Sequence, residues 1–153
     1  MFTAIEILDM AIRLEKNGET FYRDAIEKIS SASLRSFLQM LADEEVKHRD
    51  WFEAKKAAFQ SKRGDPLFDP IGSRILDGII GDQTFSLGEA DISRWSDEQS
   101  LFQTAIEFER DTILFFEMIQ ALVGHDKESV ELKEIIEEEY RHIDLLRRCE
   151  RAE

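Results

Sequence analysis

The chain has 153 residues, the size of one ordinary domain, so we expect a single domain over residues 1–153. Its 33 acidic and 20 basic residues give a formal net charge of -13, which argues against nucleic acid and anionic membranes as partners. The lone cysteine, Cys149, excludes an intrachain disulfide and a four-cysteine metal site. Because the sequence shows neither a signal-peptide pattern nor a long apolar run, we expect a cytoplasmic protein.

A first amphipathic helix is predicted over residues 4–29. Thr3 and Glu6 form a capping-box pattern, and Phe2 and Ile7 occupy the two positions of a hydrophobic staple, so the helix should begin near residue 4. Its inward positions follow the three-and-four spacing of a helix with one buried face: Leu8, Ile12, Gly18, Tyr22, Ala25 and Ile29.

The serine-rich turn SSAS separates this helix from a second one. Because the turn is short, the two helices are predicted to pack as antiparallel neighbours. The apolar face of the second helix carries Leu34, Leu38, Leu41, Phe52 and Phe59.

Residues 60–96 differ in composition from the helices on either side. They contain both prolines, Pro66 and Pro70, and five of the seven glycines. This composition predicts a connection with one short helix at most. A connection of about 35 residues is unusual in a compact domain, so it should either cross the molecule or serve a function.

Two more helices are predicted after this connection. Ser96 and Gln99 form a capping-box pattern that opens the third helix, Gly124 closes it, and Asp126 caps the fourth. The inward positions are Phe102, Ala105, Phe116, Ile119 and Val123, followed by Leu132, Ile135, Leu146 and Cys149. The predicted fold class is therefore all-α, a four-helix bundle of two antiparallel hairpins joined by a long crossover between the second and third helices.

Each of the four apolar stripes is interrupted by charged or titratable residues. A buried carboxylate is costly unless a charge or a proton compensates it, so these positions need an explanation. The inward-facing titratable residues are Glu15, Glu45, His48, Glu109, Glu139 and His142.

The two halves of the sequence repeat this pattern. Glu15 precedes Glu45 by 30 residues, Glu109 precedes Glu139 by the same interval, and each member of the first set recurs 94 residues later. AIRLEKNGETFY aligns with AIEFERDTILFF, and EEVKHRDWF aligns with EEYRHIDLL. The third and fourth helices are therefore predicted to be a second copy of the first two, related by a pseudo-twofold axis.

Four carboxylates and two imidazoles are a suitable ligand set for two divalent cations. The cations would neutralise the carboxylates, and a mixture of oxygen and nitrogen donors favours iron or manganese. In such a centre we expect Glu45 and Glu139 to bridge the ions, Glu15 and Glu109 to bind one ion each, and each histidine to complete one ion.

The chain resembles the rubrerythrin-type di-iron domains of the ferritin-like superfamily. The resemblance is carried by E-x-x-G-x-x-F-Y in the first helix, E-x-x-H in the second and their reprise in the other two, and it covers everything but residues 60–96. It implies a ferritin-like bundle in which the same six residues hold two iron ions. It also implies a reaction with peroxide or dioxygen, in oxidative-stress defence or iron handling.

Three features depart from that family. Many rubrerythrins have an additional glutamate one turn after the ligand of the third helix, where this chain has Thr112. Many also carry a four-cysteine rubredoxin module, which this chain lacks, so we expect an external electron-donor protein. Of the paired tyrosines found beside the ligands only Tyr22 is present, because its counterpart is Phe116. Tyr22 is expected in the core, with a hydrogen bond to a ligand carboxylate as the alternative.

The other titratable and aromatic residues are expected to play no part in the chemistry. His125 should lie in a loop. We expect the aromatic residues Phe21, Trp51, Phe108 and Phe115 in the core or in a homodimer contact. The glutamates expected on the surface are Glu19, Glu44, Glu107, Glu137 and Glu138.

The predicted function is that of a di-iron oxidoreductase that reduces peroxide. Two alternatives stay open. The first is iron oxidation for storage or detoxification, as in bacterioferritins, although Val46 stands where their haem-binding methionine would be. The second is a structural or regulatory bundle that holds zinc without turnover.

Overall fold

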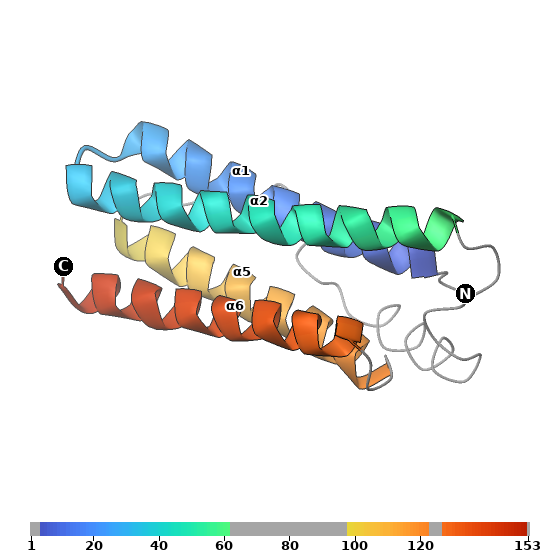
Figure 1. The fold of residues 1–153 in the computed structure, drawn as a ribbon. Helices are drawn as coiled ribbons and strands as arrows, with labels where there is room; N and C mark the ends of the chain where they lie inside the picture. The colour runs from blue at the N-terminus through green and yellow to red at the C-terminus, as the bar shows by residue number, and fades with distance from the viewer. Residues whose placement is uncertain (1–3, 62–97, 123–126, 153) are drawn as a thin grey trace. The chain divides into compact units, whose positions relative to one another are not determined.

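The computed structural model describes residues 4–61, 98–122 and 127–152, and the regular elements in these ranges are all α-helices (Figure 1). The helices are α1 (Ala4–Lys28), α2 (Ala32–Ser61), α5 (Glu98–Leu122) and α6 (Lys127–Ala152). The predicted all-α class is therefore confirmed. Within the described ranges, no helix combines the length and the apolar character that crossing a membrane requires.

The helices form two compact units, each of them a helical hairpin. The N-terminal hairpin consists of α1 and α2, and the C-terminal hairpin consists of α5 and α6. Figure 1 shows the two helices of each hairpin side by side along most of their length. The prediction of one domain over residues 1–153 stays a prediction.

Ion pairs between α1 and α2 establish the direction of the N-terminal hairpin. Asp9 near the start of α1 pairs with Lys56 near the end of α2, at 2.6 Å. Arg23, further along α1, pairs at 3.4 Å with Asp43, which is earlier on α2. The two helices therefore run antiparallel, as the short turn predicted.

The C-terminal hairpin is antiparallel by the same test. Gln120, close to the end of α5, donates a hydrogen bond of 3.4 Å to the carbonyl oxygen of Ser129, close to the start of α6. Glu117, one turn earlier on α5, accepts a 2.5 Å hydrogen bond from the hydroxyl of Tyr140, further along α6. The helices of both hairpins are therefore antiparallel, as expected if the second hairpin repeats the first.

Ser31 in the SSAS turn sets the start of α2. Its hydroxyl accepts a hydrogen bond of 3.4 Å from the Leu34 amide, and its carbonyl oxygen accepts one of 2.9 Å from the Arg35 amide. These are the bonds of an N-cap serine, which satisfies amides that have no partner inside the helix. The predicted turn is therefore confirmed, with α2 beginning at Ala32.

Each helix buries the predicted apolar stripe. Ile12 and Cys149 are exceptions, because both are half-buried rather than inside. Among the aromatic residues, Phe21, Phe108 and Phe115 are buried, whereas Trp51 is half-buried. The predicted inward apolar residues found buried are Leu8, Tyr22, Ala25, Ile29, Leu34, Leu38, Leu41, Phe52, Phe102, Ala105, Phe116, Ile119, Leu132, Ile135 and Leu146.

Glu19 is not the surface residue that the sequence predicted. Its side chain is only 18% exposed and contacts two guanidinium groups, that of Arg23 at 2.8 Å and that of Arg49 at 2.6 Å. Because Arg49 lies on α2, the contact ties the two helices of the N-terminal hairpin together. The prediction was wrong because a glutamate at this position can be sheltered by long basic side chains from the neighbouring helix. Glu107 and Glu137, by contrast, are exposed as expected.

The ion pairs of Glu19 make the stability of the protein depend on pH. Burial raises the pKa of Glu19, but hydrogen bonds from Arg23 and Arg49 outweigh this effect and hold the pKa below its ordinary value of 4.5. A carboxylate with a lowered pKa stabilises the folded state above its unfolded pKa, and this contribution is lost as pH falls through the folded pKa.

We therefore expect Glu19→Gln to lower the free energy of unfolding by about 1 kcal/mol near pH 7, since the pair is only partly shielded from water. The difference from the wild type should shrink as pH falls below 4.5. Urea unfolding at a series of pH values measures it. A difference that stays constant into the acidic range would contradict this assignment.

Several predicted features lie outside the described residues. They include the connection over residues 60–96, which the structure describes only at its first two residues, and the loop residue His125. Side-chain predictions for Phe59 and Val123 also fall outside. The same holds for the predicted helix caps and the staple residue: Phe2, Thr3, Ser96, Gly124 and Asp126.

Candidate metal centre

The buried carboxylate and imidazole side chains of the described residues are those that interrupt the apolar stripes. Each hairpin supplies three, namely two carboxylates and one imidazole. No lysine or arginine in the described ranges is buried to the same degree. The residues, each at most 3% exposed, are Glu15, Glu45, His48, Glu109, Glu139 and His142.

The N-terminal half-site consists of Glu15 on α1 with Glu45 and His48 on α2. The distance from His48 Nδ1 to Glu15 Oε2 is 3.6 Å, and the three residues offer ligand atoms that lie within 4.8 Å of one another. Glu45 and His48 share one face of α2 because they are three residues apart. The antiparallel pairing of the helices then brings Glu15 to the same level.

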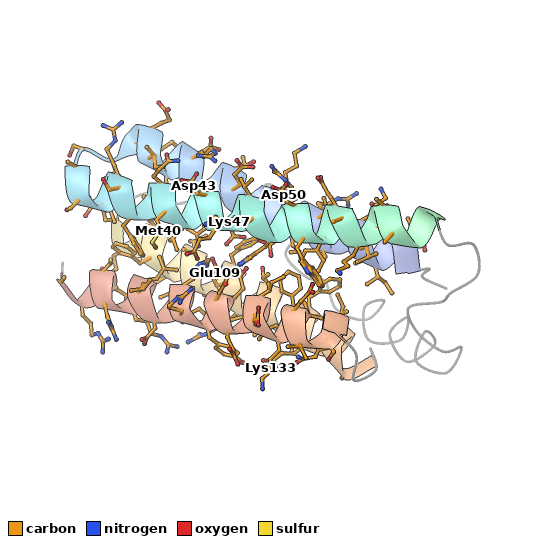
Figure 2. All side chains as sticks on the ribbon, viewed as in Figure 1. Met40, Asp43, Lys47, Asp50, Glu109 and Lys133 are labelled. Atoms are coloured by element: carbon orange, nitrogen blue, oxygen red, sulfur yellow. The ribbon has the colours of Figure 1, made fainter. Side chains whose placement is uncertain are left out.

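The C-terminal half-site has the same composition: Glu109 on α5, labelled in Figure 2, with Glu139 and His142 on α6. His142 Nδ1 lies 3.6 Å from Glu109 Oε1 and 3.2 Å from Glu139 Oε2. The ligand atoms of these three residues are likewise within 4.8 Å of one another. The structure therefore brings together the predicted residues of each hairpin, while their assignment as metal ligands stays a prediction.

Two comparisons with known proteins bear on this arrangement. A family model for rubrerythrin matches residues 6–70, which include both helices of the N-terminal hairpin and its half-site. A solved structure from Thermotoga maritima, described as a ferritin-like diiron-carboxylate protein, matches 98% of this chain and 95% of its own, with a TM-score of 0.71 and 23% sequence identity. Residues 6–70 are thus similar to rubrerythrin, and the chain as a whole has the fold of the Thermotoga maritima protein. Among curated proteins, none matches this sequence significantly.

The match to the solved structure confirms the predicted fold class. Because it extends over 98% of the chain, it includes the C-terminal hairpin as well as the part that the rubrerythrin model covers. The ferritin-like fold is a four-helix bundle with one long crossover connection, as the sequence predicted.

The donor atoms of the two half-sites fit divalent transition-metal ions. Each half-site buries two carboxylates, which together carry two negative charges when ionised. Burying such charges is unfavourable unless opposite charge lies close by, and one divalent cation balances both. Carboxylate oxygens combined with an imidazole nitrogen suit iron, manganese or zinc. Each hairpin could therefore hold one cation.

The glutamates that directly precede the ligand candidates are outside these clusters. Glu44 and Glu138 are half-buried, and neither belongs to the two groups of closely spaced donors found among the described residues. Neighbouring residues point in directions about 100° apart on a helix, as expected from 3.6 residues per turn. Of the two adjacent glutamates in EEVKH and EEYRH, only the second therefore faces its half-site.

The position three residues after the ligand candidate of α1 and of α5 carries no carboxylate. It is Gly18 in the N-terminal hairpin and Thr112 in the C-terminal hairpin. Thr112 is 1% exposed, and its hydroxyl donates a hydrogen bond of 2.9 Å to the carbonyl oxygen of Phe108 on its own helix. The hydroxyl is thus bonded to its own helix backbone. Tyr22, fully buried, occupies its expected core position, and a bond from it to a ligand carboxylate stays a prediction.

Sequence reasoning missed the ion pair between Glu19 and Arg49. Glu19 and Arg49 are 30 residues apart, as are Glu15 and Glu45, but equal intervals do not place two pairs at equal levels of an antiparallel hairpin. The interval between residues that pair across this hairpin falls toward the turn, from 47 for Asp9 and Lys56 to 20 for Arg23 and Asp43. The interval that Glu15 shares with Glu45 therefore gave no signal for this ion pair.

Proposed function

We propose that this chain is a non-haem di-iron protein in which the N-terminal and C-terminal half-sites together hold two iron ions. The observation that carries the proposal is the recurrence of one buried set, two glutamates and one histidine, at the same register in both hairpins. The diiron-carboxylate description of the Thermotoga maritima protein, which has the same fold, supports iron as the metal.

The six residues would act as ligands, with Glu15, Glu45 and His48 in one hairpin and their counterparts in the other. Their burial keeps bulk water away, which strengthens the attraction between carboxylates and cations. Since four carboxylates offset four positive charges, the centre is neutral with two divalent ions. Manganese and zinc are the alternatives that the same donors would accept.

We further propose that the reaction is the reduction of peroxide. Two ferrous ions held by these residues would supply the two electrons that, with two protons from solvent, convert one molecule of hydrogen peroxide to two of water. The carboxylates of the chain would favour oxidation, because negative groups close to a metal stabilise its more highly charged state. With one cysteine in the sequence, the electrons that restore the ferrous state would come from an external donor protein. A homodimer and a cytoplasmic location stay predictions.

Anaerobic loading with ferrous iron, followed by rapid mixing with hydrogen peroxide or dioxygen, tests this function. We expect both irons of each chain to be oxidised, and faster by peroxide than by dioxygen. Faster oxidation by dioxygen in a large hollow assembly would support iron storage instead. No oxidation by either, together with tight binding of zinc, would contradict both redox functions. Glu44→Ala serves as a control that should react as the wild type does.

A further inference from the structure

The two half-sites differ in the pair of residues beside them. In the sequence repeat, Glu19 corresponds to Ile113 and Arg49 corresponds to Ile143. Glu19 and Arg49 form an ion pair of 2.6 Å whose side chains are 18% and 21% exposed. Ile113 and Ile143 are 4% and 5% exposed. Both members of the pair therefore change together, from charged in the N-terminal hairpin to apolar in the C-terminal hairpin.

Arg49 is close in sequence to the ligand candidates of the N-terminal half-site. It directly follows His48 and lies one helical turn after Glu45, on a neighbouring position of the same side of α2. An arginine side chain is long and pairs strongly with carboxylates, especially where water is scarce. Without another partner, its guanidinium would compete with a cation for Glu45 or Glu15.

Glu19 supplies that other partner. It lies one turn after Glu15 on α1, and its Oε1 accepts a hydrogen bond from Arg49 Nη1 at 2.6 Å. Its second oxygen, Oε2, accepts a hydrogen bond of 2.8 Å from Arg23 Nε. Arg23 also reaches Asp43 on α2, at 3.4 Å. Glu19 is thus fixed from both helices, and it fixes the Arg49 guanidinium in turn.

We propose that Glu19 is a positioning residue of the N-terminal half-site, which holds the Arg49 guanidinium away from Glu15 and Glu45 so that a divalent cation can bind them. The inference rests on the proposed function, because it takes the half-site to bind a cation. The C-terminal half-site has no basic residue at the equivalent position, Ile143, and accordingly has no acid at Ile113.

Cobalt(II) titration of the full chain, followed by visible absorption, tests the inference without relying on activity. In Glu19→Gln, Arg49 is released, and we expect one of the two cobalt ions to bind about tenfold more weakly, as is typical when a residue that orients a ligand is lost. Arg49→Ile should leave both affinities unchanged, because no competitor remains. The double variant Glu19→Gln/Arg49→Ile should recover the wild-type titration. Glu27→Gln, an exposed site on α1, controls for the lost charge.

The outcomes separate this inference from the proposed function. If Glu19→Gln binds both ions as tightly as the wild type, Glu19 has no positioning role, although the di-metal centre stands. If both single variants weaken binding equally and the double variant does not recover it, the pair only stabilises the hairpin, and the inference is overturned. If the wild type binds no cobalt, the proposed function fails and the inference fails with it.

Discussion

Replacing Glu45 with alanine is expected to abolish the binding of paired metal ions. Glu45 lies fully buried in the N-terminal half-site, with donor atoms near those of Glu15 and His48. Its removal takes away one of the two carboxylates that balance a divalent cation there, and alanine offers no replacement donor. Metal analysis after equilibrium dialysis against ferrous or cobalt ions should show the loss as a fall from two ions per chain to one or none.

Glu44→Ala is the matched control for this variant. It removes the same side chain from the adjacent position of the same helix, where the residue is half-buried and outside the donor cluster. We expect this variant to retain two ions. Equal losses in Glu44→Ala and Glu45→Ala would show that the assignment of the inward face of α2 to the metal is wrong.

Removing the metal is expected to destabilise the protein substantially. A ligand that binds only the folded state at about one hundred times its dissociation constant adds about 2.7 kcal/mol per site. For two sites in a chain of this length, saturation should raise Tm by roughly 10–20 °C over the chelated protein. Thermal unfolding with excess cobalt and with a chelator measures the shift.

The double variant Glu45→Ala/Glu139→Ala should lose this metal-dependent shift, because it removes one carboxylate from each half-site. The double variant Glu44→Ala/Glu138→Ala should keep it. A shift of similar size in the first double variant would place the stabilising ions elsewhere on this acidic protein.

The sequence predicted the helices and the ligand candidates through the same periodicity. Apolar residues at helical spacing predicted the inward faces, so a glutamate or histidine that fell in the stripe was predicted to be buried. All six such residues are buried. The repeat at 94 residues made the prediction firmer, since an accidental glutamate has no reason to recur at the same register.

The features that the sequence did not predict depend on contacts between long side chains of neighbouring helices. Helical periodicity does not describe these contacts. Glu19 lies beside the inward stripe, where it pairs with the long side chains of Arg23 and Arg49. Helical spacing predicts the direction of a side chain, but it does not predict which side chains of a neighbouring helix contact it. Ile12 and Cys149 were predicted to face inward, but both are half-buried, as residues at the margin of an apolar stripe can be.

A titration of the anaerobic protein with ferrous iron tests whether this chain holds two iron ions as a pair, as proposed. If the chain holds such a pair, binding should saturate at two ions per chain, and the two ions, once oxidised, should give the magnetically coupled Mössbauer spectrum of an iron pair. Saturation at a single ion, or two ions with the spectrum of isolated iron, would contradict this proposal.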